Sequence, residues 1–186
     1  LCLPSPDLTV LPFVHVLRWP GQLKGVSPEA ILLCDKLGMP GVPSLEILLR
    51  TAADHGMSSE LRYNCMLYAS RRLSDRSGPY HDQYNHASHL KQIKFVPASR
   101  VNPTDNTMKE SGLQRPSECY LDLDSSCLGF WIVQVEYKEI AANFFVEKKP
   151  SMEASIRQLL DVIANVRADK VLENRDRLSI VKNMFD

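Results

Sequence analysis

The sequence predicts an α+β fold that is rich in helices, with two related helical units around a small sheet. Helix signals recur along the chain, and the motif Pro-Ser-x-Glu at Pro43 returns at Pro150 with the same spacing of the residues that follow it. Short apolar runs bounded by turn residues indicate strands. These runs are centred on Phe13, Phe95, Tyr120 and Trp131.

The first expected elements are an extended segment and a helix. Apolar residues dominate Val10–Trp19, which predicts a strand that ends before Pro20-Gly21. Ser27 then offers an N-cap and Pro28 a first helical residue, while Gly38 marks the end of that helix.

Two further helices are expected before residue 77. The first starts at Pro43 and ends at His55-Gly56, and its apolar residues recur at the three-four spacing of one helical face. These are Leu45, Leu48, Leu49 and Ala52. The second runs from Ser59 to Leu73. Its inward residues are Leu61, Cys65, Met66, Ala69 and Leu73.

The middle of the chain gives weaker signals. Residues Tyr80 to Leu90 are polar with His and Tyr interleaved, which is compatible with a short helix. Ile93 and Phe95 alternate with a lysine until Pro97 interrupts, which is typical of a short strand at a sheet edge or of a strand end. Turn residues fill Ser99 to Ser117, so that we expect an exposed loop there.

The second half is expected to begin with strands and to end with helices. Glu118–Leu121 and Leu128–Val133 are predicted strands, and the second, apolar on both faces, should be central. Helices are expected at Tyr137–Phe145 and from Pro150 onward. The apolar stripe of the second repeated helix is Met152, Ile156, Leu159, Leu160 and Ile163. A last amphipathic segment, Ala168 to Asp186, is expected to be a helix.

The repeat predicts two helices in equivalent places. In both copies the apolar stripe should face inward, and an arginine should pair with the aspartate four residues on, Arg50 with Asp54 and Arg157 with Asp161. We expect internal units at about 13–90 and 118–186, with the exposed loop 99–117 between them. Since the sequence begins at Leu1 rather than Met, residues 1–186 are expected to be a fragment of one larger module.

Composition excludes several function classes. Lys+Arg and Asp+Glu both number 22, so no basic surface for nucleic acid or for a membrane is predicted. Five cysteines form no CxxC pair, which favours a reducing, cytoplasmic setting, with the nucleus as an alternative. Prolines break the first apolar stretch, so neither a signal peptide nor a spanning helix is expected.

Five short runs, taken in order, suggest a family. They are the helix starts at Pro43 and Pro150, Phe95-Val96-Pro97-Ala98, Pro116-x-Glu118-Cys119-Tyr120 and Leu128-Gly129-Phe130. This order, over Val14 to Asn165, resembles a fungal family of large proteins. In that family an amino-terminal ATPase domain of the Hsp90 and histidine-kinase type, similar to that of sacsin and NO VEIN, precedes a long region of unknown function. The resemblance places this chain in the later region.

The resemblance transfers no nucleotide site, because the family's ATP-binding residues belong to the upstream domain. The sequence itself has no Gly-x-x-x-x-Gly-Lys-Ser/Thr loop, and its 8 glycines are not clustered. We therefore expect no cofactor in residues 1–186.

One pattern favours metal binding. On a continuous helix Asp82, His86 and His89 fall at i, i+4 and i+7 and would share a face, with His81 beside them. The commoner interpretation of histidines in a polar stretch is that they are solvated, and this is the interpretation we adopt.

Three acids form a second pattern. On an extended strand Glu118, Asp122 and Asp124 lie on one face, where they could act as paired acids or hold a cation. Acids on the wet face of a half-buried strand are commonplace, and we interpret these as structural.

The sequence therefore predicts a non-catalytic structural or interaction module of a large, ATPase-bearing, chaperone-like protein. Its expected partners are neighbouring domains of the same long chain and a protein client. The alternative is a small metal-dependent hydrolase that uses His81, His86 and His89 with nearby acids. A third, weaker alternative is a winged-helix-like nucleic-acid binder, suggested by three helices followed by strands.

Overall fold

The computed structural model describes residues 8, 10–14, 32, 36–38, 42–103 and 108–168, with only the backbone described at 108–109 and 165–168. The helix start at Ser27, the Trp19 segment and the last helix beyond residue 168 lie outside the described residues. The chain divides into two compact units, Leu1–Ile93 and Lys94–Asp186. The expected first unit, 13–90, ends close to this division, whereas the second unit starts well before residue 118.

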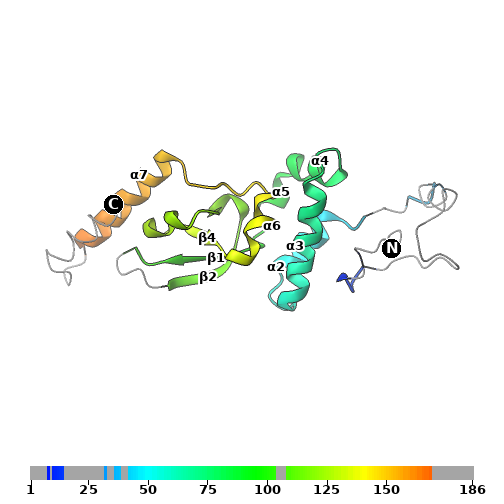
Figure 1. Cartoon of the computed structure of the whole chain (residues 1–186), viewed down its shortest axis with the longest axis horizontal. Helices are drawn as coiled ribbons and strands as arrows, with labels where there is room; N and C mark the ends of the chain where they lie inside the picture. The colour runs from blue at the N-terminus through cyan, green and yellow to red at the C-terminus, as the bar shows by residue number, and fades with distance from the viewer. Residues whose placement is uncertain are drawn as a thin grey trace. The chain divides into compact units, whose positions relative to one another are not determined.

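The first unit consists of helices, as predicted. They are α2 (Leu45–Ala53), α3 (Ser59–Leu73), α4 (Pro79–His86) and α5 (Ser88–Lys91). Helices α2 and α3 lie side by side and contact each other (Figure 1). The predicted bounds of α3 are confirmed, and its N-cap is Ser58, whose hydroxyl accepts the Leu61 N–H at 3.2 Å.

Apolar side chains of these helices meet in one core. The predicted stripe of α2 and most of the predicted inward residues of α3 are buried, and Tyr80 and Tyr84 of α4 join them. The Tyr80 hydroxyl donates a hydrogen bond to the carbonyl of Pro43, which fixes α4 against the start of α2. The polar stretch from Tyr80 onward is thus helical because its two tyrosines and Leu90 are enough to anchor it.

The predicted strand at Val10–Trp19 is wrong in its described part. Leu8 and Val10 have 3-10 geometry, and Phe13 lies in a turn, so Phe13 contributes nothing to the sheet. Local hydrogen bonds link the Leu11 N–H to the Leu8 carbonyl and the Val14 N–H to the Leu11 carbonyl, at 3.1 and 2.9 Å. The turn has a physical reason in Pro12, whose fixed φ and missing N–H suit a turn better than a strand.

The helix end predicted at Gly38 agrees with the structure. Lys36 is helical, and Gly38 has φ +66°. A glycine in this left-handed conformation is a common helix terminator, because it bears no side chain to strain.

The second unit is built on one mixed sheet of four strands in the order β2-β1-β4-β3. The strands are β1 (Val96–Val101), β2 (Met108–Gln114), β3 (Cys119–Tyr120) and β4 (Trp131–Val133). β1 is antiparallel to both β2 and β4, and β3 is parallel to β4. The α+β, helix-rich fold class is therefore confirmed, and β4 is central as predicted.

The predicted exposed loop at 99–117 is wrong, because most of it forms the β1–β2 hairpin and the 3-10 helix η2 (Pro116–Glu118). β2 is an edge strand and bonds to one neighbour, so its polar sequence does not have to fill a core. β1 is an interior strand rather than an edge strand, but Pro97 is its second residue, which agrees with the alternative of a strand end. Pro97 fits there because the ladder to β4 uses Ala98 and Ser99, while the Pro97 carbonyl accepts the Gln134 N–H at 3.1 Å.

The second unit also contains two 3-10 helices, η3 (Leu123–Leu128) and η4 (Val135–Tyr137). Its α-helices are α6 (Lys138–Ala142) and α7 (Met152–Ala168). The predicted helix at Tyr137–Phe145 is thus shorter than expected, because α6 ends at Ala142 and a turn follows, in which Phe145 takes φ +60°. The Phe95 and Phe144 rings pack edge to face in the core of this unit, with their ring centres 4.9 Å apart.

The outer edge of β3 is closed by the chain itself. Tyr120 forms a parallel bridge with Glu147, and the Leu121 N–H donates to the Glu147 carbonyl at 3.1 Å. The Asp122 N–H donates to the Lys148 carbonyl at 2.9 Å. In the part of the chain that the structure describes, no helix is long and apolar enough to cross a membrane.

Candidate interaction surface on helix α7

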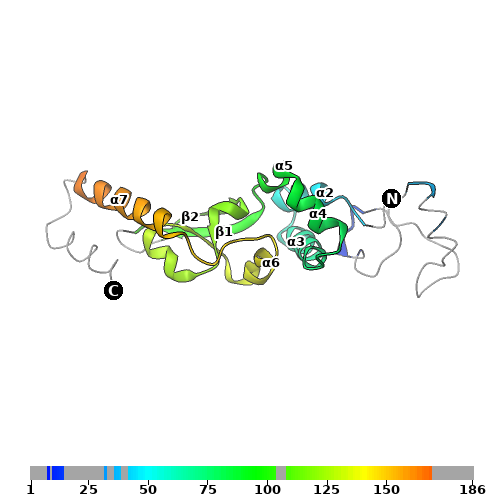
Figure 2. The same cartoon turned by 90° about the horizontal axis from the view of Figure 1, so that it is seen from above.

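Helix α7 begins with a hydrogen-bonded cap. The hydroxyl of Ser151 accepts the Ala154 N–H at 3.1 Å, which satisfies one of the N–H groups left without a partner at a helix start. Four residues apart, Glu153 and Arg157 form an ion pair at 3.0 Å. Both features lie in the repeated motif that starts at Pro150, but only the ion pair recurs in the first copy, where Ser44 makes no side-chain cap hydrogen bond. Figure 2 shows α7 as one continuous helix.

The same ion pair occurs in the first copy. Arg50 contacts Glu46 at 2.9 Å, with the same four-residue spacing and the same order of acid before base. The predicted pairing of each arginine with the following aspartate is wrong in α2. There Asp54 is the C-cap residue and accepts the Gly56 N–H at 2.8 Å, because the helix ends before the aspartate can reach back along it.

The two repeated helices differ in what covers their apolar stripes. At matched positions Leu45 and Leu49 of α2 are 0% exposed, whereas Met152 and Ile156 of α7 are 81% and 53% exposed. Leu160, one turn further along α7, is 61% exposed. We call Met152, Ile156 and Leu160 the α7 row. The prediction that both stripes face inward is correct for α2 and wrong for this row.

The opposite side of α7 is packed. Val162 is buried, and α7 contacts η3 of its own unit. Five residues of α7 line an open groove of about 550 Å³ on the exposed side. These are Met152, Glu153, Ile156, Arg157 and Leu160. Apolar surface on a helix that is already anchored by its other face is typical of a protein contact.

The predicted metal pattern is not formed. α4 ends at His86, and Ala87, with φ −94° and ψ 86°, breaks the helix before His89. The Asp82, His86 and His89 side chains therefore do not share one helical face. Among the described residues, no group of three or more His, Cys, Asp and Glu side chains is arranged to hold a metal ion.

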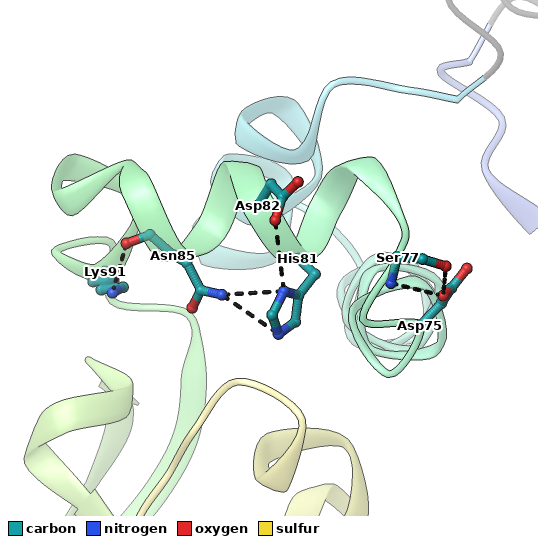
Figure 3. Close-up of polar contacts among 6 residues, drawn as sticks. All are labelled: Asp75, Ser77, His81, Asp82, Asn85 and Lys91. Atoms are coloured by element: carbon teal, nitrogen blue, oxygen red, sulfur yellow. Dashed lines mark hydrogen bonds and ion pairs between the residues drawn. The ribbon is translucent and has the colours of Figure 1, made fainter.

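Each of two histidines has a local contact instead. His81 lies between Asp82, at 3.9 Å from Nδ1, and the side-chain amide of Asn85, at 3.2 Å from the same nitrogen (Figure 3). His89 Nε2 lies 3.8 Å from the Glu46 carboxylate and links α5 to α2. These contacts describe helix surfaces rather than a catalytic constellation.

The predicted acid face is not formed either. Glu118 belongs to η2 and pairs with Arg115 at 2.9 Å. Asp122 is the N-cap of η3, and Asp124 lies inside that 3-10 helix. The strand expected to align the three acids is only Cys119–Tyr120, so period-two geometry does not apply.

Asp122 has a structural role that its contacts explain. Its carboxylate accepts the Asp124 N–H at 3.1 Å and contacts Lys149 Nζ at 3.1 Å. The backbone hydrogen bond, and then the lysine, lower the pKa of Asp122. The same contact raises the pKa of Lys149. This pair holds the segment after α6 against the end of β3.

Three side chains, one each from the neighbouring strands β4, β1 and β2, contact one another in a row across the sheet. Trp131 of β4 is half-buried, and the Arg100 guanidinium lies 4.9 Å from its ring centre. Arg100 also pairs with Glu110 of β2, at 2.6 Å. Sequence reasoning misses the contact between Trp131 and Arg100, because nothing in the sequence gives strand register.

Sequence reasoning also misses the exposed α7 row as a surface. It predicts these residues as core from a periodicity that shows that one face is apolar. That periodicity does not show which neighbour covers the face. The repeat points to burial in both copies, and only the three-dimensional structure separates them.

Sequence comparison adds the family. The profile of a family described as "Protein of unknown function (DUF3684)" matches residues 1–169. No curated protein and no solved structure matches the chain significantly. Since the matched residues make up most of the sequence, the chain belongs to the DUF3684 family.

Proposed function

We propose that this chain is a non-catalytic interaction module of a larger, chaperone-like protein that carries an ATPase domain. Its partners are neighbouring domains of the same protein and a protein client. The observation that carries the proposal is the α7 row, whose three large apolar side chains are more than half exposed on a helix that is anchored from behind.

The contacts of the ionisable residues support a non-catalytic role. Glu46, Glu110, Glu118, Asp122 and Glu153 each pair with a basic side chain across or along an element. Each such pair supports a helix, a hairpin or a turn close by. None of these pairs lines the α7 groove except Glu153 with Arg157, which are both strongly exposed.

The link to an ATPase comes from the family resemblance, and the residues that carry the resemblance are structural. Phe95, Val96 and Ala98 are fully buried, and Cys119 is nearly so. Gly129 takes φ +77° just before β4. Residues that build a core are needed by the fold whatever the protein does. Their match to the family therefore supports a shared fold of this module and not a shared active site.

The proposal is tested on the longer natural protein. Steady-state ATP hydrolysis is measured for that protein and for a form that lacks residues 42–168. If the module couples to the ATPase, the two rates differ by about fivefold or more, the range of ordinary coupling between sites. The isolated chain of residues 1–186 should hydrolyse no ATP. Equal rates, or hydrolysis by the isolated chain, contradict the proposal.

A further inference from the structure

The α7 row has the dimensions of a contact with one helix. Its three side chains recur every four residues and so form a nearly straight line along α7. Leu160 comes eight positions after Met152, which corresponds to about 12 Å along the helix axis. A line of this kind is what an amphipathic helix meets when it packs alongside another helix.

The chain contains its own example of such a contact. In the first unit the matched residues Leu45 and Leu49 of α2 are covered within a bundle whose main contact to α2 is a single helix, α3. The covering helix presents medium-sized apolar side chains at the three-four spacing. These are Cys65, Met66, Ala69 and Leu73, each at most 3% exposed.

The size of the row argues against a second copy of the chain as its occupant. A stable dimer buries about 800 Å² on each partner, over some 20 residues or more. Three side chains on one helix, within a groove lined by five residues, are too few for that. A single helix packed in a groove needs far less surface, and a handful of apolar residues can anchor it.

The charges beside the row indicate the chemistry of the occupant. Glu153 and Arg157 border the row and already pair with each other at 3.0 Å. The pair leaves little net charge to steer an acidic or basic ligand. The occupant therefore brings apolar side chains to the row and not a cluster of charges.

We propose that the α7 row docks one amphipathic α-helix of a protein partner, which presents Leu, Met, Ala or Cys side chains at the three-four spacing of α3. This inference rests on the proposed function and names the kind of partner. The α2–α3 contact is the geometric template, and Ile156, in the middle of the row, is the central anchor.

The experiment uses the chain of residues 1–186 and a probe derived from the α3 template. The probe is a fluorescently labelled peptide with the sequence of residues 58–74. It is held helical by a lactam between Glu60, which is exposed, and a lysine that replaces the half-buried Asn64. Binding is followed by fluorescence anisotropy. Far-ultraviolet circular dichroism confirms that each variant keeps the helix content of the wild type.

The variants are Ile156→Asp and, as a second variant, Met152→Asp. Val135→Asp is the matched control, because Val135 is 79% exposed but lies on η4. We expect saturable binding to the wild type and to Val135→Asp. Binding should weaken about tenfold or more in both α7 variants, since each would place a carboxylate against apolar side chains.

Three outcomes would overturn the proposal. They are failure of the peptide to bind, binding that the α7 variants leave unchanged, and self-association of the chain that Ile156→Asp abolishes. The last outcome would identify a second copy as the occupant. None of these outcomes depends on ATP hydrolysis, so the docking proposal can fail while the coupling measured with the longer protein still stands.

Discussion

Cys65 and Cys119 are buried thiols, and burial raises the pKa of each to about 12 from the ordinary value of 9.0. For Cys119 burial is the larger cause of the raised pKa, and the nearby Glu118 charge is the smaller one. Cys127 is exposed, and its thiol contacts the Asp124 carbonyl at 3.1 Å. The predicted role of Cys65 as a small buried apolar side chain is confirmed, and reactivity among these three thiols should follow exposure.

Thiol labelling tests this order. In the folded protein at pH 8, iodoacetamide should modify Cys127 and leave Cys65 and Cys119 intact, because a pKa of about 12 leaves almost none of either buried thiol as thiolate. Peptide mapping by mass spectrometry reads the result. In denaturant all three should react alike, which is the control. Modification of Cys65 at the same rate as Cys127 in the native state would contradict the burial of Cys65.

The same two thiols give a pH dependence of stability. Their pKa values are higher in the folded than in the unfolded chain, so the folded state favours the neutral form. This contribution is complete below pH 9 and is lost as the pH rises from 9 toward 12. Urea unfolding at several pH values should show a steeper alkaline decline for the wild type than for Cys65→Ala. If the stability of both proteins falls equally with pH, Cys65 does not contribute to the alkaline loss of stability.

Two glycines form a second test at this scale. Gly129 has φ +77°, and a side chain there would meet Pro103 at 3.4 Å, whereas Gly112 has open space around it. Gly129→Ala should therefore lower the free energy of unfolding by about 1–2 kcal/mol, the cost of a left-handed residue with a side chain. Gly112→Ala should change it by less than about 0.5 kcal/mol. Chemical denaturation measures both, and similar losses would contradict the backbone argument.

At the scale of elements, the repeat supplies matched helices in different surroundings. The Glu-Arg pairs are alike in α2 and α7, so local sequence determines them. The caps differ, because the Ser151 hydroxyl accepts a backbone N–H whereas the Ser44 side chain makes no cap hydrogen bond. Burial differs because it depends on what else packs nearby. Leu49 and Ile156 hold matched positions in the sequence motif, yet they are 0% and 53% exposed.

This difference in burial predicts that truncation to alanine lowers the free energy of unfolding by different amounts in the two helices. Leu49→Ala should destabilise the protein by about 2–5 kcal/mol, because it leaves a cavity between α2 and α3. Ile156→Ala should cost less than about 0.5 kcal/mol, since it removes exposed surface from a helix that favours alanine. Denaturant unfolding of both variants gives the comparison. A large loss from Ile156→Ala would show that the α7 row is part of a core.

Sequence reasoning predicts an element correctly where the residues of that element alone determine its structure. Ser58 as cap and the periodic stripe up to Leu73 give α3, and Pro43 with Leu45 and Leu49 gives α2. It fails at the β1–β2 hairpin, because an edge strand that bonds to one neighbour can be polar throughout. It also fails for the candidate site. Exposure of the α7 row is a property of packing between elements, which periodicity in a single helix does not contain.

At the scale of the whole molecule, the charge is balanced. Lys+Arg and Asp+Glu each number 22. Within the described residues, basic side chains such as Arg100, Arg115 and Lys149 are paired with acids. Nucleic-acid binding needs several basic groups free to replace counterions, and this surface is partly neutralised by its own acids.

We therefore expect no measurable affinity for nucleic acid. A labelled DNA duplex of about 20 base pairs, titrated at about 0.15 M salt, should give a flat anisotropy signal up to micromolar protein. The same duplex with a known basic protein serves as positive control. Binding that weakens steeply as salt rises would instead favour the winged-helix alternative.

The closed edge of β3 limits how molecules of this kind can join through their sheets. Segment 147–148 already occupies that edge, whereas β2, at the other end of the sheet, pairs with β1 alone among the described strands. A strand from another molecule would have to displace this segment before it could pair with β3, whereas it could pair with β2 without displacing a described strand. Pairing between the sheets of two molecules is therefore expected to use β2 before β3.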